Sequence, residues 1–477
     1  MRSLVRSISS ITALLILSVM ESSAETPLSL ESYLAQVASR DSGVAAAELT
    51  SQAGVLQAAE GRLLVMPSFF LEASHGIDKK RSAFFPATST TLDTVTFGFV
   101  ENTPWGTSAK LSYFFDHYNY EGLAPGFGPN PPKFYEGRPQ IEVSQSFWRN
   151  GFGGEIRAQK RASEARALSS HFFERFKRKR ILSVAESVYW RLALARDSLA
   201  IQRKTMERAQ MIFDWSSRRA RLGLSDQADA LQADAGKATR ELDLQLAVDQ
   251  ERAARLAFND LRRVAGDAVP ETLDPLDRKL FDSLTIPPRA ENRDDVLAAQ
   301  HMETLQTATM DLARHRNLPK FDIYGVYAAN SWEAQRSDAV ANSFEFDRPS
   351  WQVGFKFSTP LDFWAQTDAL KGFRLERQAA GSVLDRTRMD QETEWTNLTT
   401  QFREAQNRFL ITKRIEASQL KKLEYEQGRL KRGRTTTYQI LLFEQDYSLA
   451  ALTRLRTEAE ILDLIARMRL FSDGGAS

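Results

Sequence analysis

Two stretches of this chain, residues 140–265 and 351–470, repeat the same order of elements. Each begins with an alternating strand, continues with a polar helix of about 65 residues and a glycine-centred turn, and ends with a second helix running back. We expect strands at 141–147 and 351–357, long helices at about 153–219 and 365–431, and turns at 222–225 and 432–435. An uninterrupted helix of that length spans on the order of 100 Å, about three times a bilayer core. These helices must project away from whatever the strands form.

The duplication also sets the expected domain organisation. A chain of 477 residues is long enough for about three ordinary domains, but a repeat built on very long helices is expected to form one elongated unit. We therefore expect a first structural repeat at 25–285 and a second at 286–477, after a signal peptide at 1–24. A further helix is predicted ahead of the strands of each repeat, at 29–64 and 293–315.

Charge and cysteine content exclude several classes of function. The 63 basic and 61 acidic residues nearly cancel, so no overall field would gather nucleic acid. The dense basic run 177–180 is interpreted as a solvated helix face, with an anionic partner site as the alternative. The chain has no cysteine, which rules out disulfides, thiolate metal sites and a lipidated N-terminal cysteine. Its five histidines show no metal-ligand spacing, so neither a metal nor a cofactor is expected.

The N-terminus has the features of a secretory signal. Arg2 and Arg6 precede the short apolar run 11–19, and small residues follow at 22–24. We expect cleavage near Ala24 and export from the cytoplasm. No later window approaches 18 consecutive apolar residues, so no membrane-spanning helix is expected.

Several segments alternate apolar and polar residues, as strands do when their two faces meet different surroundings. The clearest are 69–75, 94–99, 108–115, 321–323 and 352–358, and aromatic residues crowd their ends. The pattern fits a transmembrane barrel with lipid outside and water inside. A soluble sheet packed on one side would give the same alternation. The hairpin 93–101 and 107–116 has no counterpart in the second repeat, so whether it adds barrel strands stays open.

Within the first long helix, an apolar seam recurs at intervals of seven residues. This spacing predicts left-handed supercoiling of packed helices. The seam comprises Ala185, Leu192, Leu199, Met206, Phe213 and Ala220. The other faces of the helix are charged, so such helices can pack against neighbours on their sides while their inner and outer faces remain in contact with water. A closed ring of helices around a water-filled interior would have this arrangement.

The chain resembles the TolC family of outer-membrane efflux channels over essentially the whole mature sequence. The similar segments are the opening 28–34, the arginine-aspartate start of the second repeat at 292–299, the leucine-proline strand start at 317–321, and the turns from barrel to helix at 144–147 and 358–361.

The resemblance implies a mainly helical fold with transmembrane β-structure, in which duplicated coiled-coil-like hairpins form an α-barrel capped by a trimeric β-barrel. It implies a homotrimer in the lipid of the cell outer membrane, with a periplasmic extension. Its partners would be a periplasmic adaptor and an inner-membrane pump or secretion ATPase, and its role passive conduction for efflux or type I secretion.

The helix turns are the candidate gate of that duct. Charges there are expected to form salt bridges that hold the mouth shut, or only to solvate the turns. The candidate residues are Arg221, Gly223, Asp226, Asp229, Arg432, Gly433, Arg434, Glu444 and Asp446. The family's tunnel-narrowing carboxylates would fall near Gln439 and Leu442, which cannot ionise, so Glu444 and Asp446 are expected to replace them, while Asp229 keeps the acidic position of the first hairpin.

Two other classes compete with a channel. A periplasmic coiled-coil adaptor or scaffold without a pore would explain the helices alone. An enzyme is not expected, because no His, Asp, Glu or Ser side chains stand at catalytic spacing. The sequence does not select a transported substrate.

Overall fold

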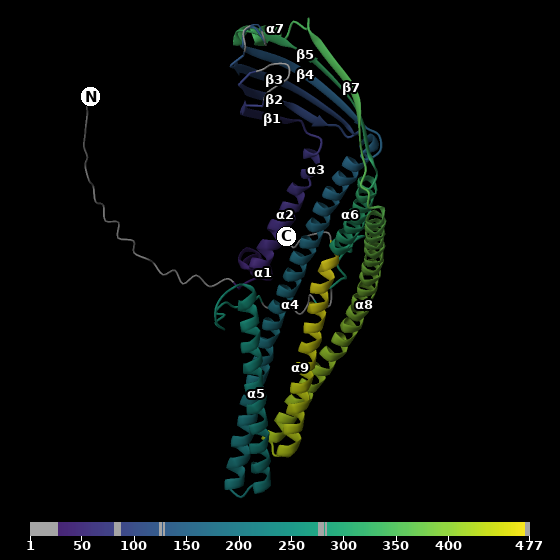
Figure 1. Cartoon of the computed structure of the whole chain (residues 1–477). Helices are drawn as coiled ribbons and strands as arrows, with labels where there is room; N and C mark the ends of the chain where they lie inside the picture. The colour runs from purple at the N-terminus through teal and green to yellow at the C-terminus, as the bar shows by residue number, and fades with distance from the viewer. Residues whose placement is uncertain are drawn as a thin grey trace, which may run out of the picture. The chain divides into compact units, whose positions relative to one another are not determined.

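The alternating segments form one antiparallel sheet (Figure 1) in the computed structural model, which describes residues 27–80, 87–123, 126, 129–274, 281 and 284–472. The predicted signal peptide, residues 1–24, lies outside the described residues. The strands are β1 (Ser68–Asp78), β2 (Ser89–Asn102), β3 (Thr107–Glu121), β4 (Lys133–Ser146), β5 (Lys320–Ala329), β6 (Ser331–Glu333) and β7 (Pro349–Ser358). They pair in the order β1-β2-β3-β4-β5-β7, and the short β6 pairs with β4. The sequence did not decide whether the hairpin at 93–101 and 107–116 adds strands. In the structure it forms β2 and β3, two full strands inside the sheet.

The register places odd-numbered residues on one face of the sheet and even-numbered residues on the other. Phe69 stands opposite Phe99, and Ile323 opposite Phe355. The odd-numbered face is apolar and exposed: Val353 is 68% exposed. Polar residues of the even-numbered face are buried instead, among them Thr96, Ser112, Asp116 and Asp322. A soluble sheet packed on one side would bury its apolar face, so this arrangement is inverted relative to a soluble fold.

The two long helices are α4 (Gly154–Arg221) and α8 (Phe363–Lys431), of 68 and 69 residues. Each turns into a returning helix, α5 (Gln227–Leu261) or α9 (Thr437–Met468). The two copies are in constant register. The turn glycines Gly223 and Gly433 differ by 433 − 223 = 210, and so do the predicted strand starts, 351 − 141 = 210. No net insertion separates strand from turn in either copy.

The helix predicted at 29–64 is wrong as a single helix, because it divides into α1 (Leu30–Arg40), α2 (Ser42–Gln57) and α3 (Glu60–Leu63). The first break is at Asp41, whose backbone is extended and whose buried carboxylate pairs with Arg263 at 2.8 Å. A carboxylate fixed outside the helix ends α1 there. The helix before the strands of the second repeat is α6 (Asp294–Arg316), as predicted.

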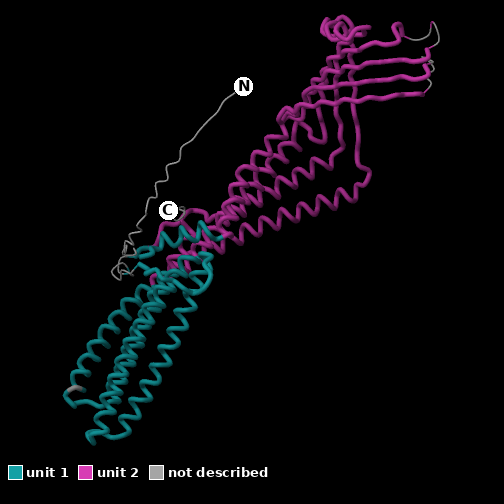
Figure 2. Tube along the Cα trace, turned by 90° about the vertical axis from the view of Figure 1, so that its left-hand side faces the viewer, with its two compact units in different colours: residues 1–41, 184–285, 404–463 teal, residues 42–183, 286–403, 464–477 magenta. Residues whose placement is uncertain are grey.

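Contacts divide the chain into two units, which Figure 2 distinguishes by colour. The first comprises Met1–Asp41, Val184–Thr285 and Glu404–Asp463, and the second Ser42–Ser183, Ile286–Arg403 and Leu464–Ser477. A core of the first unit stacks Tyr33 on Phe258, with ring centroids 4.1 Å apart. The sheet belongs to the second unit, in which the short helices η1 (Gly151–Gly153), α7 (Arg336–Asn342) and η3 (Arg469–Phe471) also lie.

The predicted seam of α4 is followed only in part. Ala185, Leu192 and Leu199 are buried, but Met206 and Phe213 are only half-buried. Further along the helix the buried positions are Thr205, Ala209, Ile212 and Ser216. The buried line shifts by one residue because an α-helix drifts by about 20° per heptad from a strict seven-residue repeat.

The basic run 177–180 is not a solvated face throughout. Lys179 is largely buried and pairs with the buried Asp294 of α6 at 2.8 Å, and it also donates to the carbonyl oxygen of Ser472. Arg178 pairs with Glu48 of α2 at 3.4 Å. The run therefore joins helices within the second unit, and the predicted solvated face is wrong for Lys179.

Candidate functional site

The first helix turn ends α4 in a hydrogen-bonded cap centred on a glycine. The N–H of Leu224 donates to the carbonyl oxygen of Arg219 at 2.9 Å, and that of Gly223 to Ala220 at 3.0 Å. This pair of bonds is a Schellman motif, and Gly223 adopts the positive φ of 70° that it requires. The Arg219 side chain then donates back to the carbonyl oxygen of Leu224 at 3.0 Å.

The second turn repeats these contacts 210 residues later. Arg434 donates from its N–H to the carbonyl oxygen of Arg429 at 3.0 Å, and Gly433 to Leu430 at 2.9 Å. Gly433 has a φ of 66°, and the Arg429 side chain donates to the carbonyl oxygen of Arg434 at 2.8 Å. The two turns are therefore the same structure, down to the arginine that clamps each one.

The capping residue of each returning helix lies three residues after the glycine of its turn. Asp226 caps α5 by accepting from the N–H of Ala228 at 3.0 Å, and Thr436 caps α9 by accepting from that of Gln439 at 3.2 Å. Asp226 thus has a local role in ending the turn. A side-chain oxygen at this position satisfies a backbone donor that the helix leaves unpaired.

The remaining charged candidates of the turns are solvated in the single chain. Arg221, Arg432 and Arg434 are exposed, and Asp229 is half-buried. Within the described part of the chain, these four residues and Asp226 form no salt bridge with one another. The salt bridges expected at the turns are therefore not formed among these five residues within one chain.

Glu444 lies inside the helix packing and not on an open face. Its side chain is 1% exposed, and its Oε1 lies 2.6 Å from Nε of Arg208 on α4. Burial raises the pKa of Glu444, and Arg208 opposes that rise. The expectation that Glu444 narrows a tunnel does not fit this position, because a partner on the neighbouring helix holds the carboxylate away from solvent.

Asp446 takes a more open position. Its carboxylate lies 3.3 Å from Nζ of Lys422 on α8, and both side chains are partly exposed. The same ammonium group lies 3.8 Å from the ring centroid of Phe443. Asp446 is therefore one half of an accessible pair between α8 and α9.

A small apolar cluster holds the four helices together near the turns. It contains Ile212 of α4, Ala233 of α5, Leu423 and Leu430 of α8, and Ile440 of α9. A buried hydrogen bond of 2.9 Å between the hydroxyls of Ser216 and Thr437 joins α4 to α9 beside it. Sequence reasoning missed this polar contact, because a serine and a threonine on charged helices give no signal of pairing.

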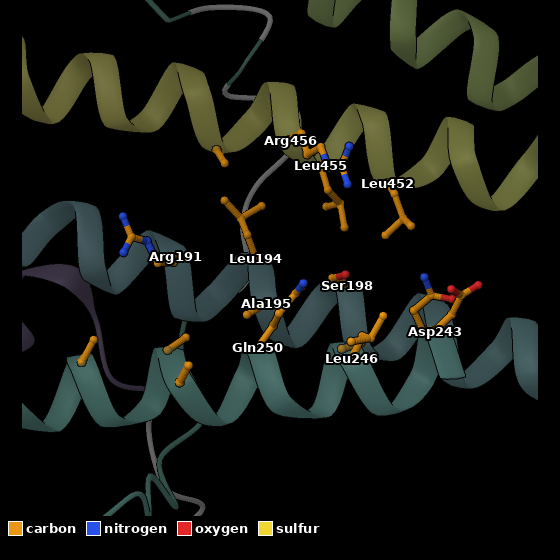
Figure 3. A pocket seen from close by; sticks show the side chains of 16 residues that line it. Arg191, Leu194, Ala195, Ser198, Asp243, Leu246, Gln250, Leu452, Leu455 and Arg456 are labelled. Carbon is orange, nitrogen blue, oxygen red and sulfur yellow. The ribbon is translucent and has the colours of Figure 1, made fainter. Parts of the chain in front are cut away.

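Farther from the turns, a groove of about 600 Å³ lies between α4, α5 and α9 (Figure 3). Leucine and alanine side chains from all three helices face it, including Leu194, Leu246 and Leu455. Leu242 and Leu246 of α5 are at least half exposed. In the single chain, the apolar line of α5 thus has no complete cover from the described residues.

No group of His, Asp or Glu side chains among the described residues could hold a metal ion. Of the helices in the described ranges, none carries an apolar segment long enough to cross a membrane.

Comparisons with known proteins show which fold this is. The structure is similar to that of the channel-forming protein CusC, with a TM-score of 0.64 at 14% identity, over 94% of this chain and 93% of that chain. It is similar to the outer-membrane channel OprN, with a TM-score of 0.64 at 15% identity, over 94% and 90% of the two chains. It is also similar to the outer membrane protein VceC of Vibrio cholerae, with a TM-score of 0.62 at 16% identity, over 92% and 95%.

The sequence alone matches no protein-family model, and no curated protein matches it significantly. The resemblance to TolC-like channels is confirmed as a likeness of fold that covers more than nine-tenths of the chain.

Proposed function

We propose that this chain is one subunit of an outer-membrane channel, the exit duct of a tripartite efflux or type I secretion system. The observation that carries the proposal is the inverted sheet, whose apolar face is exposed while polar side chains of its other face are buried. Exposed apolar surface of this extent is costly in water and favourable in lipid. The likeness of fold to outer-membrane channels supports the same location.

The sheet edges support assembly into a homotrimer. Among the described strands, β1 pairs only with β2, and β7 only with β5. An open edge in lipid leaves backbone groups without hydrogen-bond partners, so a membrane sheet must close. Six strands lie on the pairing path, and three copies would supply 3 × 6 = 18, a number that encloses a water-filled channel. The exposed leucines of α5 would be covered by helices of the neighbouring subunits.

Conduction through such a duct would be passive, opened when an adaptor and an inner-membrane pump or secretion ATPase dock at the turns 221–233 and 430–443. In the closed state, Asp229 would pair with Arg432 or Arg434 of a neighbouring subunit. Exposed pairs contribute only about 0 to 1 kcal/mol each, so such a gate would open readily on docking.

The proposal is tested by membrane fractionation and by conductance in planar bilayers. We expect a heat-modifiable trimer in the outer-membrane fraction and ion conductance from the purified protein. A pore-less periplasmic adaptor, the competing function, would fractionate as a soluble protein. A monomer that stays dissolved without detergent and leaves lipid films sealed would contradict the proposal.

The gate is tested separately by Asp229→Ala. We expect the closed-state conductance to rise, because each of the three subunits would lose one exposed pair that contributes about 0 to 1 kcal/mol. Asp249→Ala is the matched control, since Asp249 is an exposed acidic residue of the same helix about 30 Å from Asp229. Unchanged conductance in Asp229→Ala would remove this residue from the gate.

A further inference from the structure

A second groove, of about 460 Å³, lies on the exposed apolar face of the sheet, beside α7. Its floor is formed by β2 and β3, with Phe97, Phe99 and Leu111 among the lining residues. Its wall includes Val340 and Phe344, from α7 and the residues just after it. Both floor strands have their two neighbours within this chain, so the groove lies away from the edges where another subunit would add.

The wall of the groove is fixed firmly to the sheet. The ring of Phe344 stacks on Tyr113 of β3 at 5.8 Å, and the hydroxyl of Tyr113 lies 3.1 Å from that of Ser343. Gly137 of β4 allows close approach, because a Cβ there would lie 2.6 Å from the carbonyl oxygen of Ala339. The groove is therefore a built feature of the sheet and not a gap beside a loose loop.

One end of the groove carries a positive charge. The guanidinium of Arg336 lies 5.3 Å from the ring centroid of Phe115, and it forms no ion pair with any residue that the structure describes. On the same face of the sheet, Asp93 stands opposite His117, one same-face pair beyond Phe115, and it is already bonded to His75 and His117, at 2.6 and 3.0 Å.

The rest of the groove is apolar. Leu111 stands four residues before Phe115 on β3, so the apolar floor extends about 13 Å from the charged end. A cation at one end of an apolar slot is complementary to a molecule with an anionic head and a hydrocarbon tail.

We propose that this groove binds an anionic, phosphate-bearing membrane lipid, with an acyl chain along Phe97 and Leu111 and the phosphate at Arg336. The inference rests on the proposed function, because this face of the sheet meets lipid only in a membrane. An arginine suits the role, since its fork of N–H donors matches phosphate oxygens.

The test uses the full-length protein purified in detergent and titrated with phosphatidylglycerol or phosphatidylcholine of identical acyl chains, with binding followed by native mass spectrometry. We expect the wild type to prefer phosphatidylglycerol roughly threefold to fivefold, as one partly exposed charge contact allows. Arg336→Gln should abolish that preference and leave phosphatidylcholine binding unchanged. Arg348→Gln is the matched control, because Arg348 is an exposed arginine beside Asp347 that does not line the groove, and it should keep the preference.

Val340→Ser should weaken the binding of both lipids equally, since it removes apolar surface from the wall of the groove and changes no charge. The proposed lipid site would be refuted if the wild type bound both lipids equally. It would also be refuted if Arg348→Gln lost the preference for phosphatidylglycerol to the same extent as Arg336→Gln. Conductance in planar bilayers separates the two hypotheses. A wild type that does not conduct contradicts the channel, whereas a conducting Arg336→Gln variant with an intact lipid preference contradicts only the lipid site.

Discussion

The buried pair between Arg208 and Glu444 makes the sharpest stability prediction. Glu444 is almost fully buried, and its second carboxylate oxygen has no hydrogen-bond partner within the described part of the chain. Replacing Arg208 by methionine would keep the aliphatic packing and leave this carboxylate without its cation.

The expected loss of unfolding free energy depends on how deeply each partner is buried, and Glu444 is buried more deeply than Arg208. Stranding a buried charge costs about 3–5 kcal/mol, and we expect the lower end because Arg208 keeps 21% exposure. Glu444→Leu should cost less, about 1–2 kcal/mol, since Arg208 can turn towards solvent. The double variant Arg208→Met/Glu444→Leu should lie close to the wild type, because an apolar pair of similar volume replaces a buried ion pair without loss.

The assay is denaturant unfolding of the detergent-solubilised protein, followed by far-UV circular dichroism, for all three variants. Lys422→Met provides the control, because the pair of Lys422 and Asp446 joins two neighbouring helices but is solvated. Its loss should cost at most about 1 kcal/mol. Comparison of the single and double variants isolates the coupling between Arg208 and Glu444.

The pH dependence gives the same reasoning an independent check. Burial already raises the pKa of Glu444, and removal of Arg208 should raise it further. A carboxyl group with a higher pKa in the folded state takes up a proton on folding at pH values between its unfolded and folded pKa. The free energy of unfolding therefore falls as the pH rises through that range. The deficit of Arg208→Met should therefore be smaller near pH 5 than near pH 8. A deficit that equals that of Lys422→Met, or does not change with pH, would refute the argument.

Two further substitutions test the turn and the sheet. Gly433→Ala should destabilise the second hairpin by about 1–2 kcal/mol, because Gly433 has a positive φ. Gly428→Ala, one turn earlier within α8, should instead stabilise it by up to about 1 kcal/mol. Equal effects of the two substitutions in thermal unfolding would contradict the role of Gly433 in ending the helix. Val353→Arg places a charge on the exposed apolar face and should cost about 2–4 kcal/mol of membrane insertion, while Gln352→Arg on the opposite face should be tolerated. Equal amounts of both variants in the outer-membrane fraction would argue against lipid at this face.

The strands and long helices could be predicted because their signals are local. A period of two or of seven needs only neighbours in sequence, and Gly223 and Gly433 mark the turns by themselves. The same periodicity could not say which face of the sheet is exposed. That required the register and the burial of residues such as Asp116 and Asp322, which depend on the other strands.

The errors lie where distant parts of the chain meet. The break at Asp41 depends on Arg263, which lies more than 200 residues away, just after α5. The position of Glu444 depends on Arg208, which lies on another helix. A glutamate on a charged helix is usually solvated, so sequence alone favoured an open position for Glu444. The short helix α7 was not predicted, because its seven residues are fixed by contacts with the sheet and not by their own pattern.

The duplication extends to the backbone of the turns but not to the charges that join the hairpins. With the constant offset of 210 residues, the counterpart of Arg208 is Ser418, and the counterpart of Glu444 is Asp234. Serine and aspartate cannot form an ion pair. In the proposed trimer, six hairpins would form a ring, and contacts within a subunit would alternate with equivalent contacts between subunits. Only the contacts within a subunit would then contain the buried pair, so separation of the hairpins would begin between subunits.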